Sequence, residues 1–370
     1  MPIWTTELNA DSSINFAAEL AKDVSSRGIF QEDYHQYCAA AAVVPCPYVT
    51  VSGGEVLGTA AKIGGCAIDL SSWRAALLAI CTVNSPIKEV AIMHCALTQQ
   101  HLTELALALE KIGNLQVLKL DYIRVTDLTE GLTLTSLLKP FVWGASAPVE
   151  YLSLKGNCLG DDFALDPSVY SALVGNFTLT ALSLADNGIS DAGASKVLQA
   201  ARLSVALREI SFAKNSLSGT PILFTALCEL LAGTGVASAE DESTWKSCNK
   251  VIGDRNKALK DINKKRKKGG YAELPDVATP AERLAKVDGA NAIANRGIQS
   301  VDLSFNPWDA EAAGAAFAGC LGTLREPCRI PGAAPLAVRI EVRGSVKTAL
   351  SLELGGQPAE GEDGGVVVVA

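Results

Sequence analysis

The chain has 370 residues, of which 48% are hydrophobic and 19% are charged, and its formal net charge is −8. This composition supplies enough apolar material for one extended repeat domain or two compact ones, and it excludes a chain that is disordered throughout. Residues 255–268 hold eight basic residues and one acidic residue, a net +7, so the rest of the chain carries −15 (−8 less +7). A uniformly basic nucleic-acid-binding domain is thereby excluded.

Targeting and metal-binding signals are absent from the sequence. The start, Met1-Pro-Ile-Trp-Thr-Thr-Glu, lacks the basic and then apolar order of a secretory signal, and no apolar run approaches the ~18–20 residues that span a bilayer. Ten scattered cysteines without a Cys-x-x-Cys pair, and three histidines, do not fit a zinc finger. We expect a soluble cytoplasmic protein whose thiols, such as Cys95 and Cys158, are reduced and buried at apolar positions.

The first sixty residues predict an N-terminal cap. Residues 14–24 and 33–42 both show the apolar spacing of an amphipathic helix, and Pro45 and Pro47 stop the second. We predict that residues 1–62 form a helical cap that shields the apolar edge of a repeat array.

A repeated pattern, apolar-x-apolar-x-x-Asn, is the main signal in the sequence. Four copies align without gaps and end in Asn157, Asn187, Asn215 and Asn306. Weaker copies precede them, and Cys95 takes the place of the Asn in one of these. The copies start at residues 68, 90, 118, 152, 182, 210 and 301. Most of these steps leave room for a strand and a full helix.

The pattern has a physical reading. Alternating apolar residues mark a short strand with one buried face. The Asn amide can pair main-chain groups of the following turn that would otherwise be buried without partners, so we predict that the four Asn residues stack as a ladder. Helices rich in small residues follow the strands, and Asp191 and Asp309 are expected N-caps. The predicted fold class is α/β: over residues 63–325, a leucine-rich repeat solenoid (horseshoe) with parallel inner strands and outer helices.

One long step interrupts the array. From Ile210 to Val301 it is 91 residues, which fits one repeat plus a charged insertion at about 233–295. Its glycines, prolines and charges indicate an exposed segment. Two tryptophans are candidate partner-binding residues: Trp245 as an exposed anchor, and Trp308 as either a packed side chain or an anchor.

The basic run within the insertion is the other candidate partner-binding site. It consists of Lys264, Lys265, Arg266, Lys267 and Lys268. Three interpretations stay open: a solvated loop, a contact with an acidic protein surface such as a face of tubulin, and nuclear targeting or nucleic acid. Base stacking has little support, because Tyr271 is the only aromatic residue nearby.

Residues 326–370 predict a second cap. Residues 337–343 and 349–354 alternate strongly, and we expect them to form a β-hairpin that closes the exposed sheet edge. Residues 357–365 form an acidic, glycine-rich tail.

The block from Leu182 to Ala201, LSLADNGISDAGASKVLQAA, is similar to the ribonuclease-inhibitor-like leucine-rich repeat family. The resemblance covers about residues 68–325. It implies a curved protein-binding scaffold, and it leaves the partner open because this fold serves many partners.

Three further segments, in this order, resemble the 78-kilodalton centrosomal protein family: Tyr34 to Val49, Ser72 to Leu78, and Asp241 to Trp245. The resemblance implies an adaptor of the centriole, basal body or cilium, with tubulin or axonemal and centriolar proteins as partners. The basic run at 264–268 departs from that family's pattern.

No catalytic apparatus is found in the sequence. Phosphate-binding loops, Gly-x-Ser-x-Gly elbows and His-Glu-x-x-His motifs are absent, and His94 and His101 read as ordinary or capping side chains. We therefore expect no catalytic, cofactor-binding or metal residues and no cofactor. The predicted function is a non-enzymatic scaffold or adaptor of a ciliary or centriolar assembly. One alternative is an enzyme regulator, such as a small-GTPase activator (the Ran GTPase-activating proteins share this repeat type) or an inhibitor. Another is a nuclear or nucleic-acid-associated adaptor acting through the basic run.

Overall fold

The computed structural model describes part of the chain in two compact units. The described residues are 24, 27–52, 59–81, 87–109, 115–127, 138, 141–142, 149–176, 178–204, 206–232, 234–236, 257, 260, 264, 267, 284–287, 290–294, 298, 300–307, 315, 338–342 and 365–369. The N-terminal unit comprises residues 1–138 and 145–149, and the C-terminal unit comprises residues 139–144 and 150–370. Each unit is described by itself.

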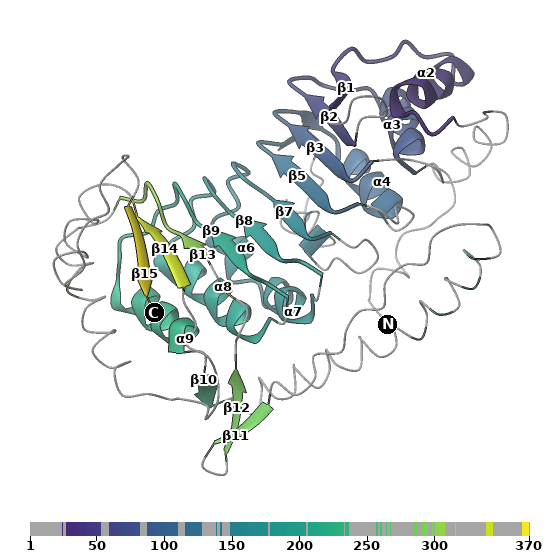
Figure 1. Cartoon of the computed structure of the whole chain (residues 1–370). Coiled ribbons are helices and arrows are strands. Elements are labelled where there is room, and N and C mark those ends of the chain that lie inside the picture. The colour runs from purple at the N-terminus through teal and green to yellow at the C-terminus, as the bar shows by residue number, and fades with distance from the viewer. Residues whose placement is uncertain are drawn as a thin grey trace. The chain divides into compact units, whose positions relative to one another are not determined.

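The N-terminal unit is a parallel sheet with an antiparallel edge. In chain order it contains α2 (Phe30–Ala40), β1 (Val49–Ser52), β2 (Ala60–Gly64), α3 (Leu70–Cys81), β3 (Glu89–Met93), β4 (Ala96–Leu97), α4 (Gln99–Leu109), β5 (Val117–Asp121) and β6 (Arg124–Val125) (Figure 1). The strand order is β1-β2-β3-β5, and only β1 is antiparallel to its neighbour. Strands β4 and β6 form a separate parallel pair.

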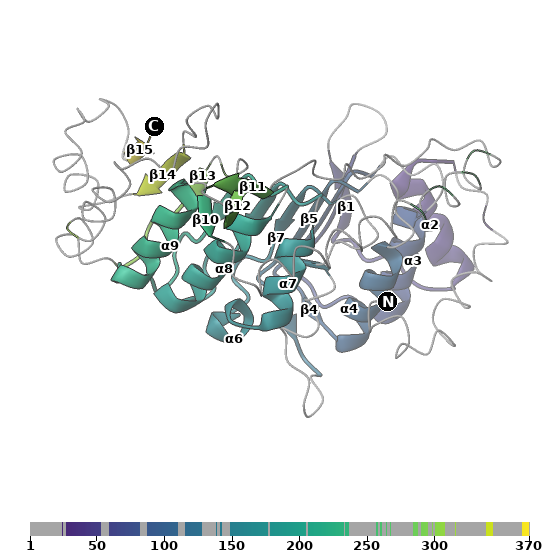
Figure 2. The ribbon, with the colours of Figure 1, turned by 90° about the horizontal axis from the view of Figure 1, so that it is seen from below.

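The C-terminal unit repeats this arrangement with more strands. It contains β7 (Tyr151–Ser153), α6 (Gly160–Ala164), α7 (Pro167–Gly175), β8 (Ala181–Ser183), α8 (Asp191–Leu203), β9 (Glu209–Ser211), α9 (Pro221–Ala232), β13 (Ser300–Asp302), β14 (Val338–Val342) and β15 (Gly365–Val369). The strand order is β7-β8-β9-β13-β14-β15, with parallel pairing from β7 to β14 and an antiparallel β15. Helices α6 to α9 lie on one face of this sheet (Figures 1 and 2).

The strands align the apolar residues of the repeat in rows. Leu152 pairs with Leu182, Leu182 with Ile210, and Ile210 with Val301, and all four side chains are at most 2% exposed. Because side chains alternate between the faces of a strand, this register buries the apolar residues of neighbouring repeats under the same helices. Each unit is therefore a mixed α/β structure built on parallel strands, which agrees with the expected class.

The predicted first repeat strand at residues 68–70 is wrong. That segment leads into α3, where the Asp69 carboxylate accepts a hydrogen bond from the Ser72 N–H at 2.9 Å and caps the helix. The first parallel strand is β2, whose Ala61 pairs with Val90 of β3. The predicted cap over residues 1–62 is therefore not only helical, because β1 and most of β2 lie within it. Its second helix begins at Phe30 instead of Asp33, and the first, at 14–24, lies outside the described residues except for Val24.

The insertion leaves the sheet uninterrupted. Ile210 of β9 pairs directly with Val301 of β13, although 91 residues separate them. A second, antiparallel sheet of order β10-β12-β11 forms from β10 (Thr234–Val236), β11 (Leu284–Val287) and β12 (Ala290–Ala294). The two ends of the insertion are thus joined to each other by the pairing of β10 with β12.

The C-terminal cap differs from the predicted hairpin. Strand β14 pairs in parallel with β13, so it continues the repeat sheet, and its antiparallel partner is β15. The expected partner, residues 349–354, lies outside the described residues. Strand β15 contains a run of four valines, a residue type that favours extended structure.

Side-chain amides link successive repeats at the ends of the strands. The Asn187 Oδ1 atom accepts a hydrogen bond from the Asn157 N–H at 2.9 Å, and its Nδ2 atom donates to the Leu154 carbonyl at 3.0 Å. Asn187 itself is 1% exposed. One amide therefore satisfies both a donor and an acceptor of the preceding repeat.

The same contact recurs in the next two repeats. The Asn215 Oδ1 atom accepts from the Asn187 N–H at 3.0 Å, and its Nδ2 atom donates to the Leu184 carbonyl at 2.9 Å. The Asn306 Nδ2 atom donates to the Phe212 carbonyl at 3.1 Å. The four Asn residues thus lie in file, each one repeat apart.

In the N-terminal unit, Cys95 occupies this position in one repeat. The Cys95 thiol donates to the carbonyls of Ile63 and Met93, both at 3.4 Å. In the C-terminal unit the Asn187 amide bonds to the equivalent carbonyls, those of Leu154 and Ala185. A thiol is a weaker donor than an amide, and its sulfur is also a poor acceptor, so the thiol reproduces only part of the contact.

We predict that the loss of the Asn187 amide destabilises the protein. Asn187→Ala leaves buried N–H and C=O groups without partners, and we expect a loss of about 3 kcal/mol in the free energy of unfolding. Asn187→Cys keeps a donor and should lose about half as much. Urea denaturation of both variants measures the difference, and equal losses would show that the side-chain donor is not what matters.

Candidate interaction surface

A second set of cross-repeat contacts positions the helix starts. The Asp161 carboxylate accepts a hydrogen bond from the Ser190 N–H at 2.9 Å, and the Asp191 carboxylate accepts one from the Thr220 N–H at 2.8 Å. The prediction that Asp191 is an N-cap is wrong: Ser190 caps α8, and Asp191 reaches the start of the next helix. The other expected N-cap, Asp309, lies outside the described residues.

The electrostatics of Asp191 follow from these contacts. Burial would raise the pKa of this carboxyl, but hydrogen bonds from Thr220, Ser218 and Gly219 outweigh burial and lower the pKa below its ordinary value. Asp191 therefore stays ionised and joins the start of α8 to the segment that precedes α9 in the next repeat.

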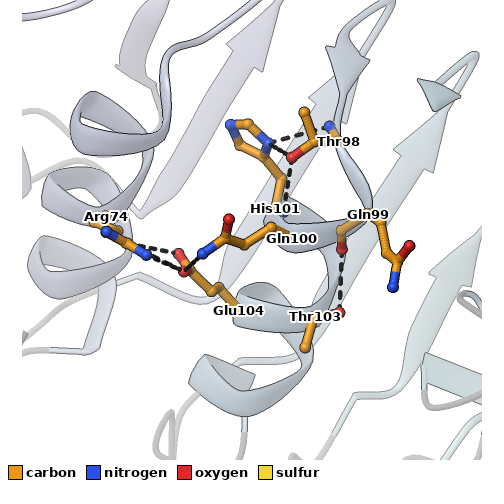
Figure 3. Close-up of polar contacts among 7 residues, drawn as sticks. All are labelled: Arg74, Thr98, Gln99, Gln100, His101, Thr103 and Glu104. Carbon is orange, nitrogen blue, oxygen red and sulfur yellow. Dashed lines mark hydrogen bonds and ion pairs between the residues drawn. The ribbon is translucent and has the colours of Figure 1, made fainter. Parts of the chain in front are cut away.

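In the N-terminal unit, His101 takes the place of the usual acidic residue in a helix cap (Figure 3). The Thr98 hydroxyl accepts from the His101 N–H at 3.3 Å, and the His101 Nδ1 atom accepts from the Thr98 N–H at 3.1 Å, which is the reciprocal geometry of a capping box. The proton is therefore on Nε2, which donates to the Ile68 carbonyl at 3.1 Å. Burial lowers the pKa of His101 below its ordinary value.

An ion pair joins the helices beside this cap. The Arg74 guanidinium of α3 contacts both carboxylate oxygens of Glu104 in α4, and its shortest distance is 2.7 Å (Figure 3). Gln100 donates to the same carboxylate at 3.1 Å. Both pair members are largely buried, so these contacts serve packing between α3 and α4.

The residue before each ladder position adopts a left-handed backbone. These residues, here called the left-handed row, are Gly65, His94 and Tyr122 in the N-terminal unit and Gly156, Asp186, Lys214 and Phe305 in the C-terminal unit, with φ between 53° and 72°. In this conformation the backbone N–H points to the neighbouring repeat: Asp186 donates to the Ala213 carbonyl and Lys214 to the Ser304 carbonyl, both at 2.8 Å. Gly65, His94 and Gly156 also donate their N–H to the neighbouring repeat, so this contact is made whatever the residue type.

The left-handed row carries large side chains at a cost. A left-handed backbone costs roughly 1–2 kcal/mol for a residue with a Cβ atom, and glycine avoids that cost. Glycine is present at Gly65 and Gly156, yet aromatic or long side chains stand at His94, Tyr122, Lys214 and Phe305. Stability alone does not explain these residues.

The large side chains pair with one another at the surface. In the N-terminal unit the rings of His94 and Tyr122 stack with centroids 4.7 Å apart. In the C-terminal unit the Lys214 ammonium lies 5.8 Å from the centroid of the Phe305 ring, and Phe305 is 53% exposed. Each unit therefore presents one amphipathic pair at the ends of its strands.

The partner-binding residues predicted from the sequence are only partly described. Lys264 and Lys267 are helical and exposed. Trp245, Lys265, Arg266, Lys268 and Trp308 lie outside the described residues. The left-handed row was not predicted, and its only sequence signal is the glycine before the ladder position in two of the repeats.

One predicted thiol is wrongly placed. Cys158 is exposed and follows the ladder residue Asn157, so it does not belong to the apolar set. Cys95 is buried, as expected.

Over the described ranges, no three His, Cys, Asp or Glu side chains come close enough to hold a metal ion. Nor is any helix in those ranges both long and apolar enough to cross a membrane.

Comparison with known proteins identifies one repeat. Residues 175–198, from the end of α7 through β8 and Asn187 into α8, match the family model described as "Leucine Rich repeat". A search of curated proteins finds no match. The matched segment supports a leucine-rich repeat family, and repeats of this kind form extended surfaces for protein–protein contacts.

We predict that His101 makes the stability of the protein sensitive to pH. The folded state favours neutral His101, so its contribution is complete above the ordinary pKa of 6.5 and declines as the pH falls below that value, because the unfolded chain takes up the proton first. His101→Gln keeps a capping-box residue without a titrating ring. Urea denaturation from pH 8 to 5 should show a smaller acid-induced loss for this variant than for the wild type.

His101→Ala is the matched control. It also removes the titrating ring, but it leaves the Thr98 N–H without its acceptor. His101→Ala should therefore be less stable than His101→Gln at every pH. Identical pH profiles for the wild type and His101→Gln would contradict the assignment.

Proposed function

We propose that the protein is a non-enzymatic scaffold that binds other proteins through the left-handed row and the adjoining strand ends. The observation that carries the proposal is that His94, Tyr122, Lys214 and Phe305 keep large side chains at positions where glycine would be more stable. Such strain persists where the side chain serves a purpose other than folding. Aromatic and basic side chains of this kind are typical anchors of protein interfaces.

The proposal includes a solenoid of the horseshoe type. Two observations support it: the repeats within each unit stack strand on strand in register, and the described helices of each unit lie on one face of its sheet (Figures 1 and 2). In such a solenoid the open sheet face and the row beside it are available to a partner.

The histidines support a role without catalysis. His101 is a buried, neutral helix cap, and His94 is stacked on Tyr122. His35 is exposed on α2, where it contacts Gln31 at 3.2 Å. We propose that none of the three acts as a general base.

We predict that glycine substitutions in the left-handed row separate binding from folding. The double variants His94→Gly/Tyr122→Gly and Lys214→Gly/Phe305→Gly relieve backbone strain, so their unfolding free energies should stay within about 1 kcal/mol of the wild type or rise. Their protein partners should be lost. Quantitative affinity purification of the tagged full chain from cells, combined with urea denaturation, measures both properties.

A matched control removes exposed apolar side chains from the helical side. Leu165 and Ile222 are 46% and 55% exposed, and Leu165→Ser/Ile222→Ser should leave the partner set unchanged. Retention of every partner by both row variants, or equal loss in the control, would refute the proposal.

We further propose that the assembly is ciliary or centriolar, a placement that rests on the sequence resemblance alone. Two of the resembling segments contain Tyr34 in α2 and Trp73 in α3, both fully buried, so the likeness concerns the packing of the N-terminal unit. A tagged full chain should concentrate at basal bodies or axonemes in ciliated cells, relative to the tag alone. An even cytosolic distribution would count against this placement and would leave the scaffold proposal standing.

A further inference from the structure

The left-handed row of the N-terminal unit begins with a glycine. Strands β2, β3 and β5 pair in register up to their last residues, so the residues that follow them, Gly65, His94 and Tyr122, occupy equivalent positions (Figure 1). Their backbones agree as well, with φ of 68°, 54° and 53°. Two of these three equivalent positions therefore carry a ring, and the first carries no side chain.

The two rings follow the spacing of the strands. Those of His94 and Tyr122 are nearly parallel, with 6° between their planes and 4.7 Å between their centroids. Neighbouring strands of a sheet also lie about 4.7–4.9 Å apart. A ring placed on the other side of His94 at the same spacing would therefore lie above Gly65.

The space above Gly65 is open. Among the described residues, no atom lies within 4 Å of the position that a Cβ atom on Gly65 would take. Gly65 and His94 are both exposed. Gly64 also lacks a side chain, which widens the opening. Tyr122 covers one face of the His94 ring, and no second aromatic contact of His94 is found in the described part of the chain.

An exposed aromatic residue lies on the other side of this space. Val49 at the start of β1 pairs with Ile63 near the end of β2. Tyr48 precedes Val49 and is 55% exposed. The backbone thus places one exposed aromatic residue on each side of Gly65, namely Tyr48 and His94. We call the space above Gly65, with these two neighbours, the Gly65 site.

We infer that the Gly65 site binds a Trp or Tyr side chain of a partner protein, which stacks on the open face of His94. The inference rests on the proposed scaffold function and names the chemistry by which a partner is recognised. Aromatic rings favour offset stacking over the separation seen here between His94 and Tyr122. Trp and Tyr are also the side chains that most often anchor protein interfaces.

The charge of the chain favours a protein side chain over a nucleobase. Nucleic acid brings phosphates, which proteins neutralise with clustered lysine and arginine. The chain carries −8, and the residue before Tyr122 in the row is Asp121. An aliphatic side chain could occupy the same space, but it has no planar face to stack on His94.

The test follows the histidine signals of the full chain by nuclear magnetic resonance. The chain has three histidines, so selective ¹³C labelling of this residue type gives three resolvable imidazole signals. Titration with N-acetyl-tryptophan amide should shift the His94 signal upfield, with a dissociation constant of about 1 mM for a ligand that makes one stacking contact. The signals of His35 and His101 should stay in place and report that the fold is intact.

Gly65→Tyr fills the site from within the chain. Tyr122 shows that a tyrosine is accommodated at an equivalent backbone position. In Gly65→Tyr the His94 signal should be shifted upfield before any ligand is added. Its dissociation constant for tryptophan amide should rise at least about tenfold.

Gly65→Ala is the matched control. It places a Cβ atom on the same left-handed backbone, so it carries the same strain, but it leaves the space for a ring open. Its affinity for tryptophan amide should stay within about twofold of the wild type. Gly65→Tyr should resist urea better than Gly65→Ala, because only the tyrosine can stack on His94.

Four outcomes would overturn the inference. Tryptophan amide leaves the His94 signal of the wild type in place, or N-acetyl-leucine amide shifts it equally. Adenosine or N-acetyl-arginine amide binds more tightly than tryptophan amide. Gly65→Tyr binds tryptophan amide as the wild type does. Gly65→Ala loses as much affinity as Gly65→Tyr. The wild-type titration decides even if Gly65→Tyr does not fold.

Affinity purification separates this inference from the scaffold proposal. Gly65→Tyr should lose the partners that His94→Gly/Tyr122→Gly loses, and Gly65→Ala should keep them. If those partners survive in Gly65→Tyr, only the inference fails. If no partner depends on either pair of the left-handed row, the scaffold proposal fails whatever the result with tryptophan amide.

Discussion

The structure depends on pairing the backbone groups that each strand leaves buried at its end. An amide side chain meets this requirement in full, because Asn187 and Asn215 each accept from two N–H groups and donate to one C=O of the preceding repeat. A thiol meets it in part, as Cys95 shows. The residue before the ladder position is left-handed in both units, and its N–H bonds to the neighbouring repeat. The surface that we propose for binding therefore follows from a requirement for hydrogen bonds in the interior.

The repeats were predictable where one local pattern carried both the strand and the ladder. Around Asn157, Asn187, Asn215 and Asn306 the apolar alternation and the amide occur together, so the strand positions could be placed from the sequence. The pattern failed at residues 68–70, because Ile68 and Leu70 match the apolar-x-apolar spacing of a strand. In the true strand the corresponding residues are Ala61 and Ile63, and the small Ala61 side chain gives a weak apolar signal. The partner of β14 was not predictable either, since sheet pairing at long range leaves no trace in local spacing.

The candidate surface was harder to predict than the fold. The residue types in the left-handed row (His, Tyr, Asp, Lys and Phe) share no property that predicts a left-handed backbone. The row can be recognised only from the structure, where the repeats are stacked. The basic run was evident as a cluster of charge. Lys264 and Lys267 of this run are helical and exposed.

The way in which the insertion is attached has a consequence for how the chain can change. Because Thr234 pairs with Ala294, the insertion leaves and rejoins the repeat at neighbouring points. Lengthening a closed loop costs only about 0.6 kcal/mol for each doubling. Residues 237–283 can thus be exchanged for a segment of other length and charge while β9 and β13 stay paired. The sequence of this segment can therefore change without a change in the fold of the repeats.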